Sequence, residues 1–441
     1  MFLLVFVSAW GQQKRESSYA PVIEDPLEKV MAQDKSRKAA VMKRHMDLLK
    51  ERYDLSKRVT TEVTMSGGKP LSVGPTARLK TGWTWEKLAG TTPGKIKEEG
   101  SFPYLPLPHP NHVTGGMLFP QHQIKQFPRL ERFDIDFDIP EQFLPEFPPP
   151  MYLTTHKDMG DVSQGQVIVL ENYYEIFNGI LNPKQLEGLR LLLTQFPQQQ
   201  FNATGDRKSE KPSLGVTCFD CHVNGHTSGA THLVGDIRPQ SHRNRIETPS
   251  LRGVNVQRLF GSQRALKTVE DFTEFEQRGA YFDGDHLTAA KKGVNVLERG
   301  SQVHFMAEFQ ALLDFPPAPK LDIYGRLDRS MATESEKRGE AIFFGKGKCA
   351  DCHDAPYYTD NQMHDLQVER FYKPQTINDQ YIRAEGPIKT FPLRGIKDSP
   401  PYLHDGRLLT LEDVVEFFNL VQQLNLNSSE KKDLTAFLRQ L

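Results

Sequence analysis

The spacing of apolar and polar residues changes along this chain, and each pattern predicts a different kind of structure. Residues 25–58 are rich in Lys, Glu, Asp, Met and Leu at helical spacing, which predicts a solvated amphipathic helix. Between Phe102 and Met151, prolines recur so often that extended and turn segments are expected, because proline fixes φ and lacks a backbone donor. The many Phe and Leu residues in this stretch indicate an arm packed on a folded body.

Three further helices are predicted from their start signals. Asn182 stands at an N-cap position and Pro183 at the first helical position, which opens a helix over residues 182–196. Residues 333–336 (Thr-Glu-Ser-Glu) and 427–430 (Asn-Ser-Ser-Glu) are capping boxes, each followed by an amphipathic run. The chain therefore contains helices before and after residues 345–425.

A C-x-x-C-H motif occurs twice, at residues 218–222 and 349–353. Covalent attachment of a c-type haem requires this motif: two thiols add to the porphyrin vinyl groups, and the following histidine binds the iron. A zinc ribbon would bring its Cys pairs within about 15–20 residues of each other, and a thioredoxin-type site needs no histidine after the second cysteine. The sequence therefore predicts two covalently attached haems, held by Cys218, Cys221 and His222 and by Cys349, Cys352 and His353.

Composition and charge narrow the class of protein. The 441 residues suffice for two or three domains, and a net charge of −1 gives no indication of nucleic acid or an anionic membrane surface as a partner. All four cysteines belong to the two motifs. Residues 2–9 form a short apolar run closed by small residues, which indicates a secretory signal without its usual basic flank and is too short to span a bilayer. We expect a protein with no membrane span in the periplasm or another extracytoplasmic compartment.

Each motif is followed by a similar block of sequence. Residues 245–275 can be aligned with residues 387–417 with single-residue adjustments, and this alignment matches Arg264 to Arg407. Such a repeat predicts a duplicated haem domain. The expected fold is mainly α, with a signal-like segment (1–13), an N-terminal helix and proline-rich extension (14–165), a first haem c domain (166–330) and a second haem c domain (331–441).

From about residue 173 to its end, the chain resembles the bacterial di-haem cytochrome c peroxidase and MauG superfamily. The resemblance rests on the two C-x-x-C-H motifs, on "TPSLRGV" (248–254), on "PYLHDGRLLTLEDVVEF" (401–417) and on residues 343–366. It implies an exported enzyme that reduces hydrogen peroxide at the first haem. Electrons from a small c-type cytochrome or a cupredoxin would enter at the second haem. A calcium ion between the domains is also implied, and a homodimer is left open.

The chain departs from that family at the second haem. Where family members place a Met or Tyr ligand, this chain has Phe417 and Phe418, and no Met occurs after Met363. The second haem is therefore expected to be ligated by His404 or His364 or to be five-coordinate. Since Met ligation raises a haem potential, its loss favours a lower potential.

A second departure concerns the tryptophan that family members place between their haems. Residues 260–262 (Phe-Gly-Ser) offer no counterpart, and the haem-bearing part of the chain contains no tryptophan. Trp83 and Trp85 of the N-terminal region are the alternative sources of such a side chain.

Peroxide reduction also needs an openable sixth position on the iron and a nearby acid–base group. The candidates are His226, His232 and His242 as a displaceable sixth ligand, and Glu276, Asp283 and Asp285 as the distal acid. For these residues the alternatives are surface or structural histidines and helix-end or turn chemistry. Arg252 and Arg394 are expected to pair with haem propionates or to cap turns.

Two other functions remain open from the sequence. A MauG-like oxidase would store oxidising equivalents on both haems and act on a protein or organic substrate. A di-haem electron-transfer cytochrome would have both irons six-coordinate and no substrate. A high-spin ferric iron would favour either enzyme over the carrier.

Overall fold

The computed structural model describes residues 27–109, 117–131, 139–198, 213–233, 245–261, 264–276, 299–377, 380–382 and 386–441. The predicted signal segment lies outside these residues, as do His242, Asp283 and Asp285. Within the described part of the chain, no helix is both long enough and apolar enough to cross a membrane.

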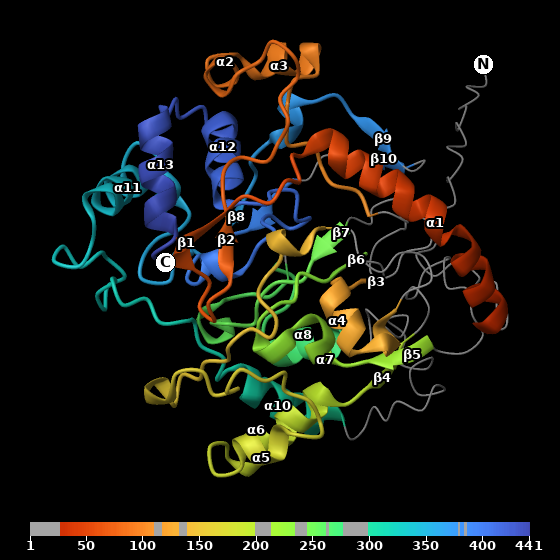
Figure 1. Cartoon of the computed structure of the whole chain (residues 1–441). Coiled ribbons are helices and arrows are strands. Elements are labelled where there is room, and N and C mark those ends of the chain that lie inside the picture. Colours follow the sequence, from red (N-terminus) through yellow and green to blue (C-terminus); the bar gives the residue numbers. More distant parts are fainter. Residues whose placement is uncertain are drawn as a thin grey trace, which may run out of the picture.

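Helices carry most of the regular structure (Figure 1). They are α1 (Leu27–Arg52), α2 (Trp85–Ala89), α3 (Pro93–Glu99), α4 (Gln121–Gln126), α5 (Tyr173–Phe177), α6 (Pro183–Leu193), α7 (Cys218–Cys221), α8 (Val269–Phe275), α10 (Arg299–Gln310), α11 (Glu334–Phe344), α12 (Leu411–Val421) and α13 (Ser428–Leu438). Single 3₁₀ turns include η4 (Val223–Gly225), η6 (Val254–Val256), η8 (Cys349–Asp351) and η10 (Ile396–Asp398).

Small antiparallel sheets accompany the helices, so the described fold is mixed and the mainly-α expectation is right only in part. One sheet has three strands in the order β3 (Met117–Leu118), β6 (Thr231–Leu233) and β7 (Arg245–Glu247). The others are pairs: β1 (Val59–Thr64) with β2 (Pro70–Ser72), β4 (Phe196–Gln198) with β5 (Ser213–Val216), β8 (Met363–His364) with β11 (Ile388–Lys389), and β9 (Gln375–Ile377) with β10 (Gln380–Ile382).

The predicted helix starts are confirmed. Asn182 caps α6 and Asn427 caps α13, each in a capping box, and Thr333 does the same for α11. The N-terminal helix ends at Arg52, earlier than predicted, because Tyr53 bridges to Ala77 and the chain turns away. Local capping signals therefore fix where these helices begin, whereas a tertiary contact fixes where α1 ends.

The proline-rich stretch is largely irregular, as expected, but it is not wholly without helix. The proline-free run that forms α4 lies directly after Pro120 and before Pro128. Phe102 and Tyr104 are buried against the C-terminal helices, with ring centroids 6.4 and 5.9 Å from that of Phe417. This stretch thus packs on the folded body.

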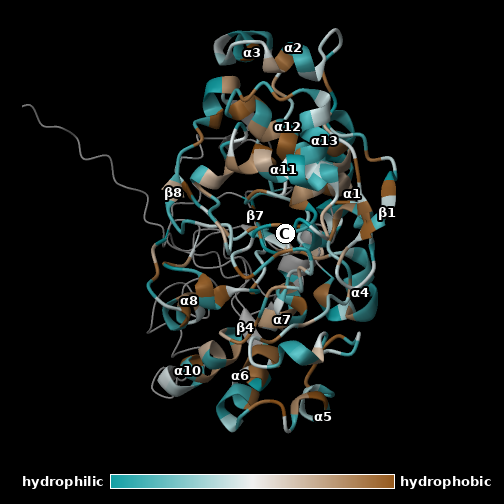
Figure 2. Ribbon diagram, turned by 90° about the vertical axis from the view of Figure 1, so that its left-hand side faces the viewer, coloured by the Kyte–Doolittle hydropathy of each residue, from teal (hydrophilic) through white to brown (hydrophobic). Residues whose placement is uncertain are grey.

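Two helix pairs lie in different halves of the molecule and are built alike. Figure 2 shows α6 beside α10 near one end, and α11 grouped with α13 in the other half, below α2 and α3. At Gly188 of α6, an added Cβ would lie 1.9 Å from the Phe305 carbonyl oxygen, and at Gly339 of α11 it would lie 2.0 Å from the Asp433 carbonyl oxygen. Glycine at the same position of both helices permits the same close crossing.

The blocks that follow the motifs also share their geometry. Gly253 and Gly395 both have φ of 72°, and their amides donate to the carbonyls of Leu313 and Leu441 at 2.8 Å. The following turns have left-handed residues at matching places, Gly261 and Arg264 in one block and Leu403 and Gly406 in the other. The blocks therefore align without a gap, and the expected match of Arg264 to Arg407 is wrong by one residue.

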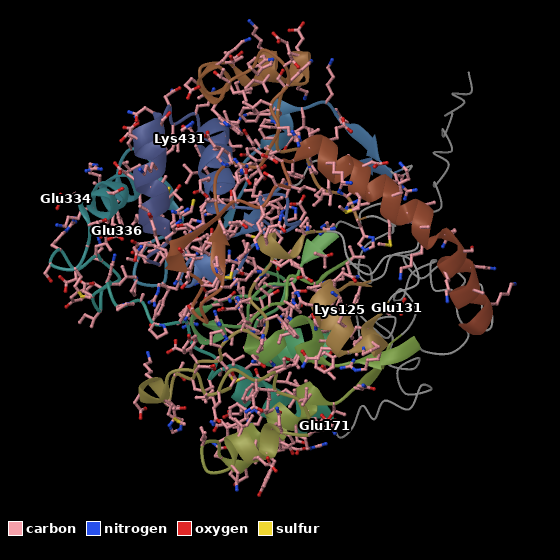
Figure 3. All side chains as sticks on the ribbon, viewed as in Figure 1. Lys125, Glu131, Glu171, Glu334, Glu336 and Lys431 are labelled. Carbon is pink, nitrogen blue, oxygen red and sulfur yellow. The ribbon has the colours of Figure 1, made fainter. Side chains whose placement is uncertain are left out.

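Largely buried ion pairs join the C-terminal helices to each other and to a neighbouring segment. Lys431 of α13, labelled in Figure 3, donates to Glu416 of α12 at 2.5 Å. Glu336, also labelled there, accepts from Lys320 at 2.7 Å near the start of α11. Apolar side chains of α11, α12 and α13 share one cluster, and Cys349 of the second C-x-x-C-H motif packs against it.

Candidate functional site

The first motif begins a short helix that two carboxylate interactions hold in place. Thr217 and Asp220 form the capping box of α7, and the Thr217 amide donates to Asp220 Oδ2 at 2.7 Å. Asp220 also receives both terminal nitrogens of Arg129, from the proline-rich stretch, at 2.7 Å each. Cys218 and Cys221 thus lie one helical turn apart, with the His222 ring directly after them.

The ionisable groups of this motif are kept neutral by burial. Desolvation raises the pKa of the Cys218 thiol to about 12, with the nearby charge of Glu276 adding to the rise. It lowers the pKa of His222 to about 4, an effect that the Pro249 carbonyl partly opposes. His222 Nδ1 completes no hydrogen bond within the described residues. A neutral imidazole is the form that binds a metal.

The second motif presents its histidine in a defined orientation. Cys349 opens η8, and the ring of His353 follows it, with Nδ1 2.8 Å from the carbonyl oxygen of Tyr358. Tyr358 is fully buried and meets Phe343 edge-on, with ring centroids 5.5 Å apart. Because Nδ1 is bound to a carbonyl, Nε2 carries the free lone pair, which is the usual arrangement of a metal-ligating histidine.

These observations match what a c-type haem requires of a protein. The four cysteines are unpaired, so each motif offers two thiols. Burial lowers the pKa of His353 as it does that of His222. Cys218 packs against an apolar cluster that includes Phe219, and Cys349 packs against one that includes Phe343. Both motifs therefore fit an apolar, iron-containing macrocycle.

The histidines predicted as sixth ligands have different surroundings. His226 is buried and uses both ring nitrogens, Nδ1 with Ser250 Oγ at 2.7 Å and Nε2 with the Asp398 carbonyl at 2.9 Å. As an iron ligand it would first have to give up one of these bonds. His232 lies on β6, close enough to His222 to lower its pKa. His232 stays a predicted ligand.

The two histidine candidates at the second haem lie on different elements. His364 is on β8, and its Nε2 lies 2.7 Å from Asp360 Oδ2. His404 lies in a tight turn, as expected from the following glycine, with the Gly406 amide donating to the Leu403 carbonyl at 3.1 Å. The His404 carbonyl accepts from the Glu247 amide at 2.8 Å, which ties this turn to the first block.

The two arginines predicted to bind propionates make protein contacts in the structure. Arg252 forms a buried ion pair with Asp398 at 2.9 Å and donates to the Pro150 carbonyl at 2.6 Å. Arg394 donates to the carbonyls of Leu441 and Pro316 at 3.0 and 3.1 Å. Both side chains thus join distant segments; a propionate contact stays a prediction.

Among the acidic candidates, Glu276 is the one that the structure describes. It caps the C-terminus of α8, and its charge acts on the Cys218 thiol, which places it near the first motif. The described residues contain no group of three or more His, Cys, Asp or Glu side chains arranged to hold a metal ion. The distal acid and the calcium ion stay predictions.

Trp83 and Trp85 lie in the core formed by the N-terminal region and the C-terminal helices. Trp83 is buried, with Lys87 Nζ 4.4 Å from its ring centroid, and Trp85 stacks on Tyr104 at 5.9 Å. Neither tryptophan is recorded at Phe260, where the structure instead places Lys389, with its Nζ 5.5 Å from the Phe260 ring centroid. Nothing in the sequence singles out Lys389, apart from its place in the repeated block.

His226 predicts a pH dependence of stability. Burial, with the Arg252 charge, lowers its pKa from 6.5 to about 3, so the folded chain keeps it neutral. Between these values the unfolded chain binds the extra proton, so this stability is complete above pH 6.5 and is lost as the pH falls toward 3. His226→Gln is expected to reduce the pH slope of the unfolding free energy by up to about 1.4 kcal/mol per pH unit.

Chemical denaturation at several acidic pH values measures this slope. The exposed His304 provides the control, since His304→Gln removes a histidine that has no buried contact. Equal slopes in the wild type and both variants would contradict the assignment.

Comparison with known proteins identifies sequence relatives of this chain. No family model matches the chain. It is 30% identical over 281 residues to the cytochrome-c peroxidase IdrP2 of Denitromonas iodatirespirans, a match that covers 52% of this chain and 76% of that protein. It is also 30% identical over 155 residues to the methylamine utilization protein MauG of Methylorubrum extorquens, covering 31% of this chain and 42% of that protein.

The similarity of this chain to solved structures is weaker than its similarity to these sequence relatives. A MauG-like protein associated with microbial copper homeostasis is 20% identical, with a TM-score of 0.41 over 59% of this chain and 88% of that chain. The di-haem peroxidase BthA of Burkholderia thailandensis is 16% identical, with a TM-score of 0.38 over 58% of this chain and 85% of that chain.

The paired motifs and the sequence relatives define the class of this protein: it is an oxidoreductase whose family uses c-type haem. The chain belongs to the bacterial di-haem cytochrome c peroxidase and MauG superfamily.

Proposed function

We propose that this protein is an exported di-haem peroxidase that reduces hydrogen peroxide to water. A small c-type cytochrome or a cupredoxin outside the cytoplasm would supply the electrons. The observation that carries the proposal is the presence of two C-x-x-C-H motifs, each with a partly buried histidine whose pKa is lowered. The relatives named as cytochrome-c peroxidases support it.

Each motif would hold one haem through its own side chains. Cys218 and Cys221 would form the thioether bonds at the first haem and His222 would bind its iron, while Cys349, Cys352 and His353 would do the same at the second. A bound haem supplies one-electron redox chemistry and an iron site for peroxide. The repeated geometry of the two blocks supports a division into tandem haem domains.

The reduction consumes two electrons and two protons per peroxide and yields two waters. The chain must therefore deliver protons to the distal side of the first haem. Glu276 is the described candidate for this transfer, because it lies near Cys218 at the end of α8. The Tyr358 carbonyl would hold the His353 ring in place as electrons arrive at the second haem.

One observation favours a second candidate function, a MauG-like oxidase acting on a protein or organic substrate. Phe417 and Phe418 stand where the family places a Met or Tyr ligand, and their rings meet edge-on at 5.2 Å. Neither side chain has an atom that can bind iron. A second haem without a Met ligand departs from an ordinary electron-entry haem, and this departure favours the oxidase.

Steady-state peroxide consumption by the purified protein, with a reduced small c-type cytochrome as donor, separates the candidates. Rapid turnover, before or after half-reduction, would establish the peroxidase. Absent turnover with a lasting peroxide-induced spectral change would move the assignment to the oxidase. No spectral response to peroxide would leave a di-haem electron carrier.

A further inference from the structure

The repeated blocks carry opposite charge types at one equivalent position. Glu247 pairs with Thr231 in the ladder of β7 and β6, and Lys389 pairs with Met363 in the ladder of β11 and β8. Two residues later in each block comes the carbonyl that acts on the motif histidine, from Pro249 on His222 and from Phe391 on His353. Glu247 and Lys389 therefore occupy corresponding walls of the two haem sites.

Lys389 is a buried cation at the junction of the two blocks. Its side chain is 3% exposed, and its Nζ donates to Gln257 Oε1 at 3.0 Å. The same Nζ lies 5.5 Å from the ring centroid of Phe260 and 5.1 Å from that of Phe391. Gln257 and Phe260 come from the first block, and Phe391 from the second. Aromatic faces and an amide oxygen stabilise an ammonium group without neutralising it.

No carboxylate within the described residues forms an ion pair with Lys389. Arg264 adds a second positive charge nearby, and burial together with that charge lowers the pKa of Lys389 to about 8. Since this value lies above neutrality, the ammonium form predominates at pH 7. The second block thus places a buried positive charge two residues before Phe391, whose carbonyl acts on His353. The Asp360 carboxylate, which pairs with His364, acts on His353 as well.

The corresponding side chain of the first block gives no such charge. Glu247 is buried and accepts from Thr227 Oγ1 at 3.2 Å. The Arg245 guanidinium, which is also buried, lies near it. The two blocks therefore carry different side chains at this position, a carboxyl in the first and an ammonium in the second, even though their backbones are alike.

We propose that Lys389 raises the reduction potential of the second haem and thereby makes it the haem at which electrons enter. This inference rests on the proposed function, because it requires both haems. One-electron reduction of a ferric haem lowers its charge by one, so a nearby cation in a poorly solvated site stabilises the reduced form. Lys389 in this way offsets the absence of a Met ligand at Phe417 and Phe418.

Optical redox titration of the purified holoprotein tests the proposal. In Lys389→Met, the higher of the two midpoint potentials is expected to fall, with the equilibrium constant for reduction reduced at least tenfold, which corresponds to about 59 mV for a one-electron couple. Lys389→Arg is expected to restore most of the loss, since it keeps the charge. Lys397→Met is the matched control: it removes a lysine of the same block that donates to the Thr64 carbonyl, and is expected to leave both potentials in place.

A higher potential that is unchanged in Lys389→Met, in protein that retains both haems, would overturn the inference, as would a shift confined to the lower potential. An equal fall in Lys397→Met would also overturn it, because the effect would then not be specific to Lys389. Failure of the proposed function has a different signature: wild-type protein with fewer than two haems per chain, or without peroxide turnover.

Discussion

A chain in which Cys218 and Cys221 are both replaced by serine is expected to carry one covalent haem instead of two and to lose peroxide turnover. Serine cannot form the thioether bonds, so the first motif can no longer attach its haem. The second motif is independent, since Cys349 opens η8 and packs against a separate apolar cluster. Haem content per chain and steady-state peroxide consumption measure the two effects.

The matched variant replaces Cys349 and Cys352 by serine. It too should hold one haem and fail to turn over, but for a different reason, because the peroxide-reactive haem remains while the point of electron entry is lost. Peroxide should therefore still change its spectrum. Wild-type turnover in either double variant would refute the assigned roles. Should the double variants fold poorly, Cys218→Ser alone, with one thioether remaining, should still give an altered haemochrome spectrum.

Asp413→Ala is expected to destabilise the protein by about 3–5 kcal/mol, since each buried donor left without an acceptor costs about 1–3 kcal/mol. The buried Asp413 carboxylate accepts from the Thr76 amide and hydroxyl at 2.8 and 2.7 Å, from the Tyr104 hydroxyl at 3.1 Å and from the Leu409 amide at 3.2 Å. These contacts fasten the N-terminal region to the start of α12. Chemical denaturation measures the loss, and limited proteolysis should show earlier cleavage between residues 59 and 109.

Asp271→Ala is the control, because Asp271 holds the same place in the first block. It accepts from the amides of Lys267 and Thr268 at 3.2 and 3.3 Å, and these bonds are exposed. Loss of such a helix-capping contact costs about 1 kcal/mol. Equal destabilisation by the two substitutions would show that Asp413 acts as a cap alone and not as an anchor for the N-terminal region.

Asp271 and Asp413 also show which features of the fold can be predicted from the sequence. Both aspartates follow a threonine by three residues, and in the structure that threonine caps a helix in each block. The pattern contains nothing that distinguishes an exposed cap from a buried anchor. The difference arises because Tyr104 and Thr76, more than 300 residues earlier in the chain, pack on one helix and not on the other.

In the candidate site, too, some features could be predicted from the sequence and others could not. The attachment residues could be read from the sequence, because C-x-x-C-H places all of its chemistry within five consecutive residues. The partners of Arg252 could not, since its charge is met by Asp398, from the other block. The buried charge of Lys389 could not be predicted from the sequence either, because its burial depends on Gln257 and Phe260 of the first block.

By itself, then, the sequence determined the two attachment motifs, the capped helices around them and the repeated block, because each depends on residues close together in the chain. Only the tertiary structure decided which histidine nitrogens are engaged and which carboxylates and cations are buried. Burial and pairing of charge depend on segments far apart in sequence, and the free energy of a buried charge is set by whatever those segments bring next to it.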